Sequence, residues 1–151
     1  MKNDFIFEHL HTHSHFSLLD GLSSITQLVE RAFEMDRTSV CVTDHGSIGG
    51  IPELFRTTKE YGVKPIAGME AYFCEDVKEE VVDKKRGYNH LVLLAKNIDG
   101  YKNLCKLVTR SNREGFYKKP RVDYSMLNDH KDGLIALSAC IGGLPQESII
   151  K

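Results

Sequence analysis

Residues 39–46 read SVCVTDHG, an apolar segment that passes directly into polar residues and a glycine. Alternating valine and cysteine is typical of a strand, and Asp-His-Gly ends it. The segment before it is amphipathic, because Ile25, Leu28, Val29 and Ala32 follow the spacing of one helical face. This helix-then-strand unit, closed by polar residues, predicts the organisation of the rest of the chain.

The same alternation of apolar runs and amphipathic segments recurs along the sequence. Further strands are expected at residues 5–7, 65–73, 91–95 and 134–138. Residues 75–88 are highly charged and predict a solvated loop or hairpin, and residues 111–123 are expected to be irregular. Strand–helix alternation predicts an α/β fold with a mostly parallel sheet, either open or rolled into a barrel.

Side chains that bind metals follow several of these predicted strands. In folds of this class the carboxyl ends of the strands form the active face, so such residues are expected to meet there. They are His11, His13 and Asp20 after the first strand, His45 after the second, Glu70 at the third and Cys140 after the fifth. His90 fits less well, because it precedes its apolar run. Either that strand begins earlier, or it runs antiparallel to its neighbours.

Composition limits the possible classes of protein. The chain has 151 residues, enough for about one domain, and a net charge of -1, whereas a free-standing nucleic-acid binder is usually more basic. Its four cysteines are scattered and form no CxxC pair, which fits the reducing cytoplasm. We therefore expect a cytoplasmic protein, and no apolar run is long enough to suggest a membrane span.

A set of motifs then resembles a known family. The segments are HLHTHS (9–14), FSLLDG (16–21), TDHG (43–46), KPIAGMEAY (64–72), HLVLLA (90–95), GYKNL (100–104), GFYKKPRVD (115–123) and GLIALSAC (133–140). Together they resemble the PHP (polymerase and histidinol phosphatase) domain, and more narrowly the N-terminal PHP domain of bacterial DNA polymerase III alpha subunits. LLDG and GFYKKPRVD are the motifs most specific to this polymerase branch.

The resemblance implies a distorted (β/α)7 barrel, of which residues 1–151 would be the first part, with about five strand–helix units. The family binds a cluster of up to three metals through nine residues. Matching motifs assign seven ligands here, namely His11, His13, Asp20, His45, Glu70, His90 and Cys140. The closing Asp-x-His motif has no counterpart, so the chain is expected to stop before it.

The ligand set also indicates which metal is expected. Nitrogen, carboxylate and thiolate donors together suit zinc, with manganese or iron as alternatives, and the thiolate of Cys140 favours zinc. Asp44 is expected to orient His45 or another ring from behind. His9 and His15 are interpreted as neighbours of the centre that do not bind metal.

Three functions remain open on this reading. The first is a metal-dependent phosphoesterase, acting as a 3′–5′ exonuclease attached to a replicative polymerase. The second is a structural or interaction module whose metal site stabilises the fold, and the third is a small-molecule phosphatase of the histidinol phosphate type. The parent would be a DNA-directed DNA polymerase, a nucleotidyltransferase that uses magnesium, and residues 1–151 could not polymerise DNA by themselves. Expected partners are DNA, the other domains of that subunit and replisome proteins such as a proofreading exonuclease.

One further segment bears on nucleic-acid binding. Tyr117, Lys118, Lys119 and Arg121 combine aromatic and basic side chains over five positions. Such a combination can contact single-stranded nucleic acid, although a solvated basic loop is the commoner meaning of such a run.

Overall fold

The computed structural model describes residues 7–79 and 87–150, and its architecture is α/β, as predicted. The elements in chain order are α1 (Ile25–Glu34), β1 (Ser39–Val42), α2 (Ile51–Tyr61), β2 (Lys64–Phe73), β3 (Asn89–Ala95), α3 (Ile98–Arg113), β4 (Phe116–Tyr117), β5 (Lys119–Val122), α4 (Tyr124–His130), β6 (Leu134–Leu137) and α5 (Leu144–Ile150). Within this described part, no helix is long and apolar enough to span a bilayer.

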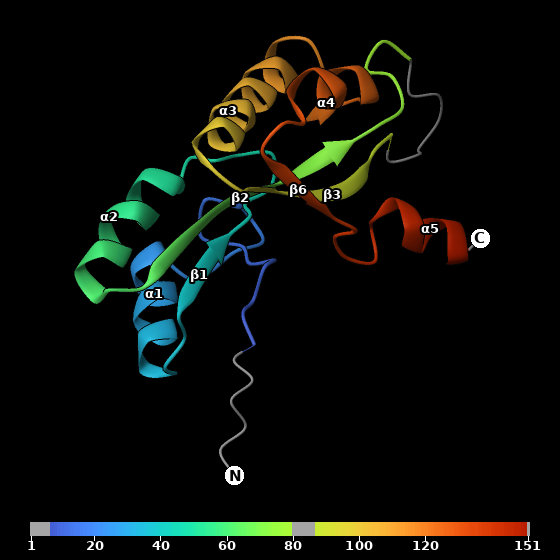
Figure 1. The fold of residues 1–151 in the computed structure, drawn as a ribbon. Helices are drawn as coiled ribbons and strands as arrows, with labels where there is room; N and C mark the ends of the chain where they lie inside the picture. The colour runs from blue at the N-terminus through green and yellow to red at the C-terminus, as the bar shows by residue number, and fades with distance from the viewer. Residues whose placement is uncertain (1–6, 80–86, 151) are drawn as a thin grey trace.

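The long strand β2 is the centre of a six-stranded sheet (Figure 1). Residues 64–67 pair with β1 in parallel, and residues 68–73 pair with β3 in antiparallel orientation. The end of β2 also pairs in parallel with β5, on the edge opposite β3. Strand β6 pairs with the outer edge of β3, and β4 forms a short hairpin with β5. The strands β1, β2, β5 and β6 therefore point the same way, and β3 runs against them.

The two faces of the sheet differ in what covers them. Ala67, Met69 and Ala71 alternate along one face of β2 and pack into two apolar clusters with the helices. In Figure 1, α1 and α2 lie beside β1 and the first half of β2, and α3 and α4 lie beside its second half. The other face carries a smaller cluster around Cys41 and Val92. Side chains that were expected to bind metal, such as Glu70 and His90, continue along that second face.

Local sequence signals account for the helix boundaries. Ser24 caps α1 by accepting from the backbone N–H of Gln27, whose side chain accepts from the backbone of Ser24, as a capping box requires. Helix α2 ends at Gly62, which adopts the left-handed conformation with φ of 69°. Both features agree with the sequence.

Residues 111–123 are not irregular, because α3 extends through Arg113 and the segment then forms β4 and β5. The first strand was expected at residues 5–7. Residues 5 and 6 lie outside the described part, and Phe7 belongs to no strand.

Candidate metal centre

A buried carboxylate lies at the middle of the candidate centre. Glu70 is in β2, and its side chain is only 1% exposed. Its oxygens lie 3.1 Å from His11 Nε2, 3.2 Å from His13 Nε2, 2.8 Å from His45 Nδ1 and 3.0 Å from His90 Nδ1. Four imidazoles from three parts of the sequence therefore surround one carboxylate.

The two remaining predicted residues lie at the edges of this group. Asp20 Oδ2 is 3.1 Å from His45 Nε2 and 3.9 Å from His13 Nε2, and its side chain is 55% exposed. Cys140 Sγ is 3.4 Å from His90 Nδ1 and 3.7 Å from a Glu70 oxygen. The structure thus brings all seven predicted residues together, with Asp20 on the side that faces solvent.

Strand direction explains how His90 reaches the centre. Because β3 is antiparallel to β2, the start of β3 lies at the same end of the sheet as the carboxyl ends of β1, β2 and β6. His90 is opposite Tyr72, two residues beyond Glu70, so both project from the same face. The strand also begins earlier than its apolar run, at Asn89. Both explanations left open by the sequence are therefore correct.

A tight turn after β6 brings Cys140 back toward His90. Ala139 has a positive φ of 61°, and Gly143 donates its N–H to the carbonyl of Cys140 at 2.8 Å. The backbone N–H of His90 donates to the carbonyl of Gly142 at 2.8 Å. This turn is consequently fixed against the start of β3.

Several of these atoms approach one another closely without forming hydrogen bonds. Such unpaired atoms show whether a cation would fit the centre. His11 Nε2, His45 Nδ1 and Glu70 Oε2 are buried and have no hydrogen-bond partner among the described residues. Buried polar atoms are rarely left in this state. A metal ion accepts exactly such lone pairs from imidazole and carboxylate donors, so the donor set fits divalent cations.

The donor atoms form three overlapping groups, each within 4.8 Å. These groups are His11, His13 and Glu70; His13, Asp20 and His45; and His45, Glu70 and His90. Since each group shares a member with another, the arrangement suits neighbouring ions better than one isolated ion. Cys140 lies beside the third group.

The charges in the centre are strongly coupled. Burial by itself raises the pKa of Glu70, but the four imidazoles it contacts outweigh burial and hold that pKa far below its usual range. Contact with Glu70 raises the pKa of His45, burial opposes this, and Asp20 adds to the increase. The carboxylate is therefore ionised at neutral pH, as a metal ligand must be.

Asp44 supports the centre indirectly. Its buried carboxylate accepts hydrogen bonds from the Ser14 backbone N–H, the Ser14 hydroxyl and the Ser17 hydroxyl, each at 2.7 Å. Ser17 Oγ in turn lies 3.4 Å from His13 Nδ1 and accepts from the His45 backbone N–H at 3.1 Å. Asp44 was expected to orient His45 or another ring. Among the described contacts, it reaches the ring of His13 through Ser17.

Ser14 and Ser17 are the supporting residues that sequence reasoning missed. Both are buried, at 0% and 1% exposure. Their only signal was a position among the histidines, where a serine is usually taken for part of a solvated loop. Their role depends on the distant Asp44 and becomes visible only in the fold.

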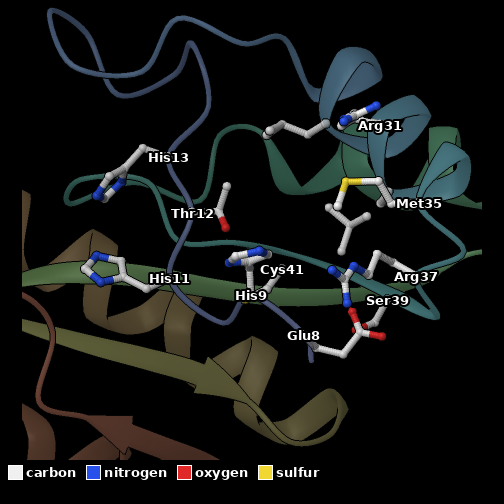
Figure 2. A pocket seen from close by; sticks show the side chains of 13 residues that line it. Glu8, His9, His11, Thr12, His13, Arg31, Met35, Arg37, Ser39 and Cys41 are labelled. Carbon is white, nitrogen blue, oxygen red and sulfur yellow. The ribbon is translucent and has the colours of Figure 1, made fainter. Parts of the chain in front are cut away.

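The other histidines of the first motif point elsewhere. The ring of His9 lies edge-on to Phe7 at 5.0 Å, and the ring of His15 lies 4.5 Å from that of Phe16. A cavity of about 470 Å³ lies near His9, between the N-terminal segment and α1. Figure 2 shows the side chains that line it. His11 and His13 line this cavity together with His9, so the cavity borders the centre.

The basic segment divides into different environments. Arg121 is buried and donates to the carbonyls of Gly115 and Val77 at 3.1 and 2.7 Å, which is a structural role. Lys118 lies over the ring of Tyr117 at 5.5 Å. Lys119 lies over a different ring, that of Tyr72, at 5.4 Å. Only Lys119 of these basic residues contacts the aromatic ring next to the centre.

Comparisons with known proteins identify the family of the chain. The PHP domain family matches residues 9–151. The DNA polymerase III subunit alpha of Aquifex aeolicus is 44% identical over 96% of this chain and 13% of that protein. The subunit of Thermus aquaticus is also 44% identical, over 93% of this chain and 12% of that protein. The chain therefore spans only a small part of the length of these relatives.

Solved structures give weaker similarities. A Bifidobacterium adolescentis protein described as a metal-dependent phosphoesterase aligns with a TM-score of 0.47 and 21% identity, over 70% of this chain and 32% of that one. An amidohydrolase from Chromobacterium violaceum aligns with a TM-score of 0.45 and 25% identity, over 69% of this chain and 34% of that one. Family membership instead follows from the match over residues 9–151. The chain belongs to the PHP domain family and is similar, over nearly its whole length, to a segment of DNA polymerase III alpha subunits.

Proposed function

We propose that this chain carries a metal-dependent phosphoesterase centre that cleaves phosphodiesters, acting as a 3′–5′ exonuclease within a bacterial polymerase alpha subunit. One observation carries the proposal. Six side chains of metal-binding type gather around Glu70, and three buried donor atoms of this group, one of them on Glu70, have no hydrogen-bond partner among the described residues. The proposed ligands are His11, His13, Asp20, His45, Glu70, His90 and Cys140.

The chemistry follows from the donor set. Divalent metals bound there would neutralise phosphate charge and lower the pKa of bound water, so that hydroxide is available near pH 7. Zinc fits the mixture of imidazole, carboxylate and thiolate best, with manganese or iron as alternatives. Glu70 holds the imidazoles toward one point, and the hydrogen bonds through Asp44 and Ser17 fix His13. The exposed carboxylate of Asp20 marks the side from which a substrate enters.

The decisive experiment offers the zinc- or manganese-loaded protein a primer with a mismatched 3′ end. We expect nucleotides to be released from that end, and His11→Ala combined with His13→Ala to abolish the release. His15→Ala is the matched control, because this histidine is in the same segment but packs on Phe16. Absence of cleavage in the wild-type protein, or equal cleavage in the double variant, would refute the proposed function.

A structural role for the same centre is the second candidate. The proposed ligands come from the N-terminal segment, the loop after β1, β2, β3 and the turn after β6, so ions there would join parts of the chain that are distant in sequence. Metal binding to such a site contributes free energy to folding. A large fall in melting temperature on chelation, without nuclease activity in the loaded protein, would favour this role.

The proposed context follows from the relatives. DNA, the other domains of a polymerase alpha subunit and a proofreading exonuclease are the proposed partners, and the cytoplasm is the proposed location. Magnesium would serve the polymerase activity of the parent protein, outside this chain. Turnover of a small phosphomonoester in preference to a DNA end would instead indicate a small-molecule phosphatase.

A further inference from the structure

The β4–β5 hairpin places a lysine on the same face of the sheet as Glu70. Side chains alternate along a strand, so Glu70 and Tyr72 of β2 share one face. Tyr72 is opposite Arg121 in β5, and Lys119 precedes Arg121 by two residues, which puts Lys119 on that face too. The β2–β5 pairing ends at Tyr72, and on the same edge of β2 the residue beside Glu70 is His45.

Aromatic contacts link this lysine to the metal centre. The ring of His45 is nearly parallel to the ring of Tyr72, with centroids 5.7 Å apart and planes inclined by 10°. Lys119 Nζ lies 5.4 Å from the centre of the Tyr72 ring. The ammonium group is therefore separated from a proposed metal ligand by a single side chain.

The hairpin is held in this position by backbone features. Lys118, alone between the paired residues Tyr117 and Lys119, has a positive φ of 58°. Such a conformation is costly for a residue other than glycine and persists where the surroundings enforce it. Gly46 supplies one such contact, since a Cβ added there would lie 2.9 Å from Pro120 and 3.0 Å from Tyr72. The hairpin thus packs directly on the loop that follows β1.

Lys119 is also available to a ligand. It is exposed, and among the described residues 7–79 and 87–150 it pairs with no carboxylate. Its neighbours in the segment differ, because Arg121 is buried against backbone carbonyls and Lys118 lies over Tyr117. Of these three basic residues, Lys119 is therefore the one that lies beside the centre.

We propose that Lys119 forms an anion subsite that binds a phosphate of a nucleic-acid strand next to the phosphate held at the metal centre. The inference rests on the proposed phosphoesterase function for its choice of ligand. A phosphomonoester has a single phosphate, which the metals would bind. The subsite at Lys119 would then stay empty. A strand fills both positions, so Lys119 selects nucleic-acid strands over small phosphomonoesters.

The test measures binding of a phosphorothioate-linked thymidylate tetramer to the full metal-loaded chain at several salt concentrations. We expect Lys119→Ala to weaken binding about tenfold, as loss of one charge-assisted phosphate contact would. The slope of log K against log salt should fall by about 0.7, the value for one phosphate contact on a single strand. Binding of thymidine monophosphate should stay unchanged, and Lys119→Arg should retain most of the tetramer affinity.

Lys118→Gln is the matched control, because it removes the same charge from the adjacent position of the hairpin. Equal losses in Lys118→Gln and Lys119→Ala would show diffuse attraction and overturn the subsite, as would a wild-type chain that does not bind the tetramer. Melting temperature and metal content are compared first, to confirm that each variant is folded and loaded.

Hydrolysis of bis(p-nitrophenyl) phosphate by the wild-type chain separates the two proposals. Hydrolysis together with Lys119-independent binding refutes the subsite and leaves the phosphoesterase function standing. Lys119-dependent binding without any hydrolysis refutes the phosphoesterase function and supports the subsite.

Discussion

Replacing Asp44 by alanine tests the support of the metal centre without touching a proposed ligand. The carboxylate accepts three hydrogen bonds of 2.7 Å from Ser14 and Ser17, and it is 1% exposed. A bond to a charged acceptor contributes about 1.5–3 kcal/mol. The two hydroxyl groups can rotate toward other acceptors, whereas the Ser14 N–H cannot. We therefore expect Asp44→Ala to lower the free energy of unfolding by about 3–4 kcal/mol.

The assay is urea and thermal unfolding of the chelated protein, so that metal binding does not contribute. For a chain of this length, the expected loss corresponds to a fall in melting temperature of about 10 °C. Asp44→Asn should lose less, about 1–2 kcal/mol, because its amide oxygen still accepts and its NH2 can donate to a serine hydroxyl. Asp99→Ala is the control, since that carboxylate is 74% exposed and lies 3.7 Å from Lys102; such a pair contributes about 0–1 kcal/mol.

Metal affinity provides the second measurement. Asp44 fixes Ser17, and Ser17 contacts His13, so zinc should bind Asp44→Ala about 10–100-fold more weakly. If the alanine variant unfolds like the Asp99 control and binds zinc like the wild type, the hydrogen bonds around Asp44 do not support the centre and this reasoning is wrong.

Two further predictions concern pH and backbone packing. In the chelated protein, the lowered pKa of Glu70 contributes stability that is present above its usual pKa of 4.5 and is lost as pH falls. The raised pKa of His45 contributes stability that is present below its usual pKa of 6.5 and is lost as pH rises. Urea midpoints should therefore peak between these values in the wild type and vary much less in Glu70→Gln; an unchanged profile would contradict the coupling. A Cβ at Gly21 would lie 1.9 Å from the Ser14 carbonyl oxygen, so Gly21→Ala must shift the loop that carries the nearby carboxylate ligand and should weaken zinc binding about tenfold. Gly62→Ala, where nothing lies within 4 Å but φ is 69°, should cost about 1–2 kcal/mol in stability and leave zinc titrations unchanged.

Local signals made the helices predictable, and long-range pairing limited the rest. Ser24 with Gln27 and the stop at Gly62 act within one turn of their own helix, so the sequence alone could reveal them. The strand at Lys119–Val122 has no such local signal, because two of its four residues are charged and one is a proline. It is a strand because its end pairs with Tyr72 and Phe73, more than forty residues earlier.

The candidate site was predictable in its residue types but not in its arrangement. Histidines and acids after successive strands predict one cluster, and the structure brings them together. Nothing in the spacing indicates that Glu70 lies among the imidazoles, since this depends on the sheet pairing that places His45 beside it. The supporting serines were equally hidden, because their partner Asp44 lies about thirty residues away.

The direction of β3 determines whether the centre can assemble. In a purely parallel sheet, a residue at the start of a strand lies at the edge opposite the carboxyl ends, so His90 could not meet Glu70. Because β3 runs antiparallel, its first residues and the end of β6 meet at one edge, where His90 also contacts Cys140. A histidine just before an apolar strand therefore indicates that this strand runs antiparallel to its neighbours, when the other residues of the site lie at the carboxyl ends of their strands. The misfit of His90 in the sequence pattern was itself a signal of the topology.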